Sequence, residues 1–386
     1  MKNFYSFNPV KVLFGNGLLD NIERELDDVE RILIVHSGRS SINTNALPKT
    51  KEALSRKKIF EFTKFSENPD ISDGINAIKY AREKEIEFIL CIGGGSCIDF
   101  GKLICLGMYA DEKNLWEILK KEHNAPNKTL PFGTVLTLPA SGSEVNNALV
   151  ISNKKTKEKI STFFLTLYPR FSVLDPSFTI NLNKEQTALG ILDMFMHTIE
   201  QYLTFPVNTP LQDRQAEAIL TTLIEYGPKL LENLTDYNLR AIIMWCGSAA
   251  VNGTISRGVP PDWSMHVIGH EITALYGVRH AQTLAFVFPA LFKLRSEQKK
   301  EKLKLFGKNV WKITEDTADL HHEAIIATEN FIKKLGVCTD MAECGLNKKE
   351  VANRVVSNLK SQNFQPVGEK SDVTLDDIYN VLISNK

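Results

Sequence analysis

The chain has 386 residues, of which 43% are hydrophobic and 24% charged, proportions typical of a globular protein. Lys+Arg and Asp+Glu both count 46, so no global field favours nucleic acid or an anionic membrane. We found no signal peptide in the first residues, no apolar run of about 18–20 residues and no CxxC among the six cysteines, and therefore expect a reduced, cytoplasmic protein without a membrane span.

The first half of the chain alternates apolar runs typical of β-strands with helical patterns. The apolar runs are RILIVHSG (31–38), EFILCIGGG (87–95), GTVLTLPASGS (133–143) and RFSVLDP (170–176). Between the first two, residues 71–86 have the pattern of an amphipathic helix, which we expect Ser72 to cap. Strands that alternate with helices predict a parallel sheet covered on both faces, as in a Rossmann-like dinucleotide-binding domain.

Beyond about residue 185 the strand patterns nearly vanish. The helical patterns there span residues 184–203, 213–234, 239–253 and 301–313. We therefore predict an α/β domain over residues 1–184 and an all-helical domain over residues 185–386.

Residues 91–104, CIGGGSCIDFGKLI, place three glycines between a predicted strand and a predicted helix. Glycines allow the backbone to approach a ligand closely, and a helix N-terminus offers free N–H groups and a positive dipole end to a pyrophosphate. Ser96 stands at the expected N-cap position. The alternative interpretation is a tight strand-to-helix turn without a ligand.

The segment HSGRSS (36–41) follows the first clear strand and contains Arg39 and Ser40 with no acidic residue nearby. A cation and hydroxyl groups at this position suit the 2′-phosphate of NADP better than the ribose hydroxyl of NAD. A solvated loop arginine is the alternative.

Histidines and one aspartate form two pairs at helical spacing. Asp193 and His197 are four residues apart in a helix that is apolar almost all round, and His266 and His270 repeat the spacing. Gly277 then breaks the helix before His280. The set Asp193, His197, His266 and His280 offers one oxygen and three nitrogens, which suits Fe²⁺ or Zn²⁺. Each histidine alone is also compatible with a hydrogen-bonded core position.

Five motifs occur in one order along nearly the whole chain: GGGSCIDFGK (93–102), LPASGSE (138–144), LDPSF (174–178), ILDMFMHTIEQY (191–202) and HVIGHEITALYGVRHAQTLA (266–285). Together they resemble the iron-containing (group III) alcohol dehydrogenases. The stretch GVPPDWSMHVIGHE (258–271) is most similar to the branch of NADPH-dependent butanol dehydrogenases and aldehyde reductases. The resemblance implies a dehydroquinate synthase-like architecture, in which the first domain binds NAD(P) and the second holds the metal, and a homodimer. The N-terminal stretch FYSFNPVKVLFG (4–15) has the pattern of an exposed strand pair, where related enzymes commonly dimerise.

The resemblance also implies the roles of individual residues. Asp193, His197, His266 and His280 match the family's metal ligands, and His270 matches an extra active-site histidine that is not a ligand. The positions that match cofactor contacts are Gly94, Gly95, Ser96 and Asp99 for the pyrophosphate, Thr137, Leu138 and Ser143 for the adenosine and nicotinamide side, and Gly38, Arg39, Ser40 and Lys159 for the 2′-phosphate. Two positions depart from the family pattern: Ser141 replaces a usual Thr, and Arg39 a small residue.

The implied reaction is hydride transfer between NADP(H), or alternatively NAD(H), and a small alcohol or aldehyde, with the metal as a Lewis acid. His270 is our candidate proton relay, and a structural hydrogen bond is its alternative role. Asn147, Trp263 and Phe164 are candidates for the substrate wall. Rival functions are a metal-dependent hydrolase or lyase on a related fold, and a non-catalytic metal- or nucleotide-binding protein.

Overall fold

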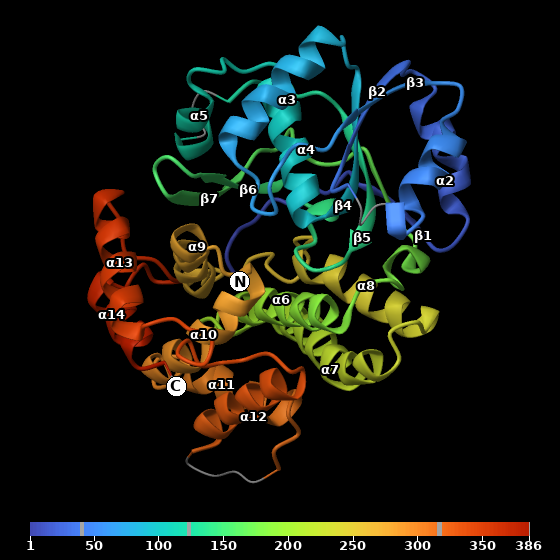
Figure 1. Cartoon of the computed structure of the whole chain (residues 1–386). Coiled ribbons are helices and arrows are strands. Elements are labelled where there is room, and N and C mark those ends of the chain that lie inside the picture. The colour runs from blue at the N-terminus through green and yellow to red at the C-terminus, as the bar shows by residue number, and fades with distance from the viewer. Residues whose placement is uncertain (39–41, 122–124, 315–318, 386) are drawn as a thin grey trace. The chain divides into compact units, whose positions relative to one another are not determined.

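The computed structural model describes residues 1–38, 42–121, 125–314 and 319–385 (Figure 1). The chain divides into two compact units. The sheet unit comprises Phe7–Leu182 and Asn233–Asn252, and the helical unit comprises Met1–Ser6, Asn183–Glu232 and Gly253–Lys386.

The sheet unit is built on six parallel strands in the spatial order β1-β8-β5-β4-β2-β3. The strands are β1 (Lys11–Phe14), β2 (Arg31–His36), β3 (Lys58–Phe62), β4 (Phe88–Gly94), β5 (Phe132–Leu138) and β8 (Phe171–Leu174). Buried strands of this kind are apolar along their whole length, as the four runs predicted.

Successive side chains of these strands enter two different cores. On β2, Ile32 and Ile34 join a core with η1 (Leu18–Leu26) and α2 (Ala46–Ala53). Leu33 and Val35 join a second core with α3 (Ile71–Glu83), α4 (Gly95–Gly107) and α5 (Leu115–Lys121). Because side chains alternate across a strand, the sheet is covered on both faces, with α2 on one side and α3 and α4 on the other (Figure 1). The predicted Rossmann-like α/β fold is confirmed.

Helix α8 (Tyr237–Val251) clusters with the sheet unit although it follows residue 184. Its Ser248 hydroxyl donates to Glu144 Oε1 over 2.6 Å. The guanidinium of Arg240 donates to the Leu182 carbonyl over 3.1 Å. A hairpin of β6 (Ala148–Asn153) and β7 (Glu158–Phe163) and the short helices η2 (Ser143–Val145) and η3 (Pro176–Thr179) complete the sheet unit. Our division at residue 184 remains a prediction about domains.

The helical unit is built from helices, some of which are buried along most of their length and others on one face. They are α6 (Lys184–Tyr202), α7 (Pro210–Glu232), α9 (Ser264–Tyr276), α10 (His280–Leu294), α11 (Lys300–Asn309), α12 (Leu320–Lys334), α13 (Lys348–Ser361) and α14 (Leu375–Ile383). Helix α10 packs against α6, α9, α12 and α14. No helix in the described part of the chain combines the length and apolarity that crossing a membrane requires.

Three local predictions were wrong. Asp70, two residues before Ser72, caps α3, and its carboxylate accepts the hydrogen bond from Ser72 N over 3.0 Å. Gly94, two residues before Ser96, is the N-cap of α4, so Ser96 lies within the first helical turn. The N-terminal residues, which we expected to form an exposed strand pair, contribute one strand, β1, paired with β8.

Gly101 sets the distance between α4 and the sheet. A Cβ at this position would lie 2.1 Å from Cys91 Sγ and 3.5 Å from Ile89 Cγ2. We expect Gly101→Ala to lower the free energy of unfolding by about 1–3 kcal/mol through overpacking, measured by urea unfolding with far-UV circular dichroism. Adding Cys91→Ala removes the overlapping sulfur and should make Gly101→Ala less costly. A single variant as stable as the wild type would contradict this account.

Candidate active site

Helix α6 presents Asp193 and His197 on one face, one turn apart. The helix begins at a capping box, in which Asn183 accepts from Gln186 N and the Gln186 side chain accepts from Asn183 N. Asp193 is buried, and its Oδ1 lies 3.8 Å from His197 Nδ1. A carboxylate in this apolar setting is costly unless further cationic or donor groups reach it.

Helices α9 and α10 supply the other histidines. His266 and His270 lie one turn apart on α9, and His280 is the first residue of α10. Between the helices Gly277 has a φ of 70°, in the left-handed region that favours glycine at a helix end. The break predicted at Gly277 is therefore present, and it lets His280 return toward α6.

The two helices approach closely at Gly269, which lies between His266 and His270. A Cβ there would lie 2.7 Å from Thr283 Oγ1 on α10. The Thr283 hydroxyl also donates to the Gly269 carbonyl over 3.1 Å. The absence of a side chain at Gly269 thus brings the two histidine-bearing helices together.

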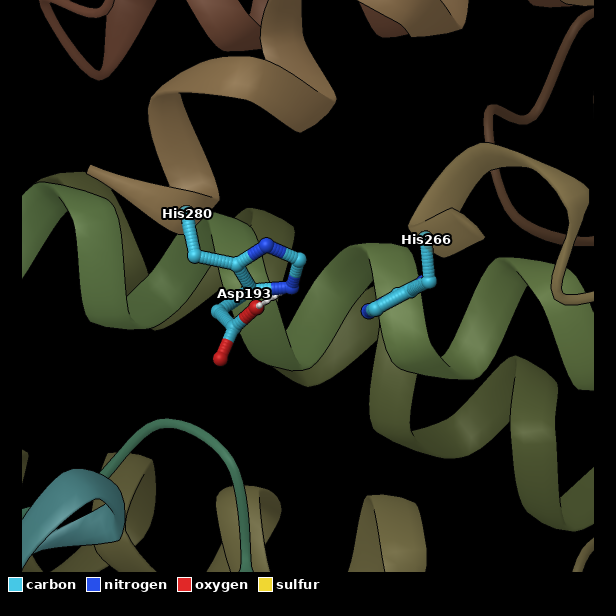
Figure 2. Close-up of side chains that lie close together, drawn as sticks. All are labelled: Asp193, His266 and His280. Carbon is cyan, nitrogen blue, oxygen red and sulfur yellow. Dashed lines mark ion pairs between the residues drawn. The ribbon is translucent and has the colours of Figure 1, made fainter. Parts of the chain in front are cut away.

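Asp193, His266 and His280 converge on one point. Each offers one ligand atom, and these atoms all lie within 4.8 Å of one another. Figure 2 shows the Asp193 carboxylate on α6 next to the His280 ring, with His266 on the same side of the helix. His280 Nε2 is 3.9 Å from Asp193 Oδ1, and the His197 ring centroid is 4.4 Å from that of His266. The predicted fourth ligand, His197, therefore lies beside this group of three.

The chemistry of these side chains fits a divalent cation. Asp193 Oδ1, His197 Nδ1 and His266 Nε2 are buried and find no hydrogen-bond partner within the described residues. Burial lowers the pKa of both His197 and His266 to about 4, so both imidazoles are neutral at pH 7 and keep a lone pair for a ligand bond. Lone pairs converging without donors are what a metal ion would satisfy.

His270 and Trp263 border this group. His270 is buried, and its ring centroid lies 4.6 Å from that of His280 and 6.4 Å from that of His266. The Trp263 ring lies edge-on to His266, with centroids 5.3 Å apart. His270 is therefore next to the predicted ligands, where both the relay and the structural role remain available.

A second group with ligand atoms within 4.8 Å consists of Glu297, His321 and His322. Here the side chain of Glu297 is 71% exposed and pairs with Lys300 as well as with His321 Nε2. Ordinary surface ion pairing accounts for this arrangement, so the group around Asp193 is the better candidate for a metal.

Glu200 is a buried carboxylate of the site that the sequence reasoning missed. It lies on α6 one turn beyond His197 and contacts His266 Nδ1. Burial raises the pKa of Glu200 well above its ordinary value. The signal was available, because a Glu in an apolar helix requires a buried partner, as we had argued for Asp193.

The glycine turn lies at the carboxyl end of β4 in the sheet unit. Gly94 ends β4 in extended conformation, and Gly95 and Ser96 open α4. A Cβ at Gly95 would lie 2.1 Å from Ser141 Oγ. The N–H groups of the first turn of α4 have no hydrogen-bond partner within the helix. A larger residue at Gly95 would require Ser141 to shift.

The turn coincides with a reversal in the order of the strands. From β2 the chain passes to β3 on one side and then to β4 on the other. Gly38 follows the end of β2, and Thr137 and Leu138 end β5, where Leu138 is in register with Gly94. Ligands of open parallel sheets bind at the carboxyl ends of strands at such a switch point. Gly38, Gly94, Thr137 and Leu138 therefore lie at the edge of the sheet where a ligand is expected.

Asp99 and Ser143 are joined in a buried network behind the turn. The Ser143 hydroxyl donates to Asp99 Oδ1 over 2.6 Å, and Val150 N donates to Asp99 Oδ2. Lys102, which sequence reasoning missed, is fully buried and donates to five acceptors on Ser143, Asn146 and Ala148. Burial lowers the pKa of Lys102 to about 8, so the ammonium persists at neutral pH. The network fixes the loop after β5 onto α4.

The remaining predicted residues are placed less closely together. The Lys159 ammonium on β7 donates to Asn68 Oδ1 over 3.0 Å. Arg39 and Ser40 lie outside the described residues. Phe164 is buried in the core of the sheet unit, and its N–H donates to the Asn147 carbonyl.

Two family models match the chain. "Iron-containing alcohol dehydrogenase" matches residues 9–176, and "Fe-containing alcohol dehydrogenase family, C-terminal" matches residues 187–385. The chain belongs to the iron-containing alcohol dehydrogenase family. The predicted resemblance is confirmed.

Two members of this family resemble the chain over most of its length. The NADPH-dependent aldehyde reductase YqhD of Escherichia coli is 40% identical, with 97% of each chain covered. The NADH-dependent butanol dehydrogenase A of Clostridium acetobutylicum is 36% identical, with 89% of each chain covered.

Solved structures of the family have the same fold. That of E. coli YqhD superposes with a TM-score of 0.96 at 39% identity and covers 99% of this chain and 98% of the other. That of a butanol dehydrogenase A from Thermotoga maritima has a TM-score of 0.94 at 28% identity, covering 100% and 99%.

We expect Asp193→Asn to weaken binding of Zn²⁺ by more than about 100-fold, beyond the usual loss for an outer partner of a ligand, because the amide removes the only carboxylate of the converging group. Competition with a chromophoric chelator measures this affinity. Glu297→Gln in the second group is the matched control and should bind Zn²⁺ as the wild type does. The reverse pattern would place the ion at His321 and His322 instead.

Proposed function

We propose that this alcohol dehydrogenase interconverts small aliphatic aldehydes and alcohols of the butanal and butanol type, with NADP(H) and one divalent ion, Fe²⁺ or Zn²⁺. The observation that carries the proposal is the convergence of the ligand atoms of Asp193, His266 and His280 within 4.8 Å of one another, where Asp193 Oδ1 and His266 Nε2 are buried without a hydrogen-bond partner among the described residues. Family membership supports the redox reaction over the hydrolase or lyase alternative.

In this proposal Asp193, His197, His266 and His280 hold the ion. Neutral imidazoles and a single carboxylate leave a site with a divalent ion net positive, which favours an oxygen that gains negative charge. The bound ion supplies Lewis-acid polarisation of the carbonyl group. The burial of Asp193 and His266 keeps water away from these groups and strengthens their electrostatic effect.

Gly94, Gly95 and Ser96 would receive the pyrophosphate of the cofactor at the N-terminus of α4. Free N–H groups and the positive end of the helix dipole suit an anion there. The cofactor, when bound, supplies the hydride that the carbonyl carbon gains. Asp99, Ser143 and Lys102 hold the neighbouring loop in place, with the Lys102 ammonium within hydrogen-bond distance of five oxygen atoms of Ser143, Asn146 and Ala148.

Reduction of an aldehyde also requires a proton at the oxygen, and we propose His270 as its relay. Its ring neighbours His280 and His266, at centroid distances of 4.6 and 6.4 Å. It is the histidine of α9 outside the proposed ligand set, and an imidazole transfers protons near neutral pH. Trp263, beside His266 and His197, would give the substrate an apolar wall; Asn147 and Phe164 remain weaker candidates.

We also propose that the enzyme forms a homodimer through its N-terminal segment. The side chains of Tyr5 and Phe7 are 103% and 62% exposed, and β1 forms an edge of the sheet. Exposed aromatic side chains next to an unpaired strand edge are features of association surfaces.

The test of the proposed function is butanal-dependent loss of NADPH or NADH absorbance by enzyme stripped of metal and then reloaded with Fe²⁺ or Zn²⁺. We expect turnover only in the reloaded samples, and faster with NADPH. The more active ion identifies the working metal.

Faster turnover with NADH would keep the enzyme class and refute the NADP preference. No turnover with either cofactor, despite measured bound metal, would count against the aldehyde reductase and favour other carbonyl substrates, then the hydrolase or lyase.

Arg39 tests the cofactor preference separately. We expect Arg39→Ala to raise the KM for NADPH by about tenfold, because a charged hydrogen bond to the 2′-phosphate is lost, and to leave the KM for NADH unchanged. Steady-state kinetics with both cofactors measure the difference. Arg56→Ala, a surface arginine paired with Glu23, is the control. Equal effects on both cofactors would show that Arg39 does not read the 2′-phosphate.

A further inference from the structure

Glu200 contacts the first turn of α9 at several points. Its Oε1 accepts the Met265 N–H over 2.7 Å, and its Oε2 contacts His266 Nδ1. Its backbone carbonyl accepts the Asp262 N–H over 2.8 Å. Glu200 is fully buried. One residue of α6 therefore fixes both the start of α9 and one edge of the His266 ring.

The contact determines which nitrogen of His266 faces the candidate metal centre. Glu200 occupies the Nδ1 edge of the ring. Nε2 is buried, finds no hydrogen-bond partner in the described parts of the chain, and belongs to a residue whose ligand atom lies within 4.8 Å of those of Asp193 and His280. A carboxylate at Nδ1 favours the tautomer with the proton there, which leaves the lone pair on Nε2 for a ligand bond.

We propose that Glu200 is the positioning residue for the metal: it holds His266 in the ring orientation and tautomer that direct Nε2 to the ion. This inference rests on the proposed metal centre and adds to it the group that acts through a ligand. Helix α6 then contributes in two ways, through Asp193 and His197 at the ion and through Glu200 behind His266.

A purely structural role is the competing explanation, because the hydrogen bond to Met265 N alone would stabilise the start of α9. Glu200→Gln separates the two roles. Glutamine has the same shape but one acceptor and one donor, whereas the two oxygens of the wild-type side chain contact the Met265 N–H and His266 Nδ1. In one orientation, the glutamine N–H₂ group faces the Met265 N–H, so two donors oppose each other. In the other orientation, the N–H₂ group donates to His266 Nδ1, which moves the ring proton to Nε2 and blocks the bond to the metal.

The experiment uses the full-length protein stripped of metal and titrated with Co²⁺ and Zn²⁺ alone. We expect Glu200→Gln to bind both ions about 10–100-fold more weakly than the wild type, the usual loss for an outer partner of a ligand histidine. The d–d absorption of the Co²⁺ form should change shape as the His266 bond is lengthened or lost. Glu200→Asp keeps two acceptors on a shorter side chain and should fall between the wild type and Glu200→Gln.

Glu217→Gln is the matched control. Glu217 is a buried carboxylate of the same unit that accepts from Tyr202 and Asn309, so its replacement should lower the melting temperature without changing ion affinity. If Glu200→Gln does not fold, the same titration of Glu200→Asp against this control decides the question.

Wild-type affinity and an unchanged Co²⁺ spectrum in Glu200→Gln would overturn the role of Glu200 and leave the proposed function intact. A change in melting temperature alone, without a change in affinity, would overturn it too. A wild-type protein that binds neither ion would overturn the proposed metal centre and this inference together.

Discussion

The burial of ionisable groups in an apolar helix is the constraint on which the helical unit depends. Helix α6 carries Asp193 and Glu200 into a core where an isolated charge is prohibitive. Each acid therefore requires partners from another helix, and both find them on α9 and α10. The packing of the three helices and the convergence of the candidate ligands are consequences of the same requirement.

Both units have candidate functional groups at the ends of regular elements. In the sheet unit, β4 gives way to α4 at Gly94, and the main-chain N–H groups of the new helix have no partner of their own. In the helical unit, Gly277 ends α9 and His280 opens α10. The ends of elements supply unpaired groups at fixed positions, and the interiors of the same elements hold those positions through packing.

The sequence was most informative where an argument needed only one element. The spacing of Asp193 and His197, the break at Gly277 and the apolar strands of the sheet follow from helical or strand periodicity, and the structure contains them. The spacing of residues along the chain does not predict that α6, α9 and α10 converge, and we expected it only from the family resemblance. Glu200 and Lys102 were missed for the same reason, because their partners are distant in the sequence. Ser72 and Ser96 were preferred as caps for their residue type, yet Asp70 and Gly94 hold the cap positions because the chain turns earlier.

The contact at Gly269 bears on how the site can adapt to its ion. At this point the Thr283 hydroxyl and a methyl group of Leu284 on α10 lie close against the Gly269 main chain of α9. The spacing of His266 and His280 is therefore as rigid as the helix pair that carries them. If these residues hold an ion as proposed, a change of ion radius would be met by rotation of the ligand side chains or by movement of α6 against the packed pair α9 and α10.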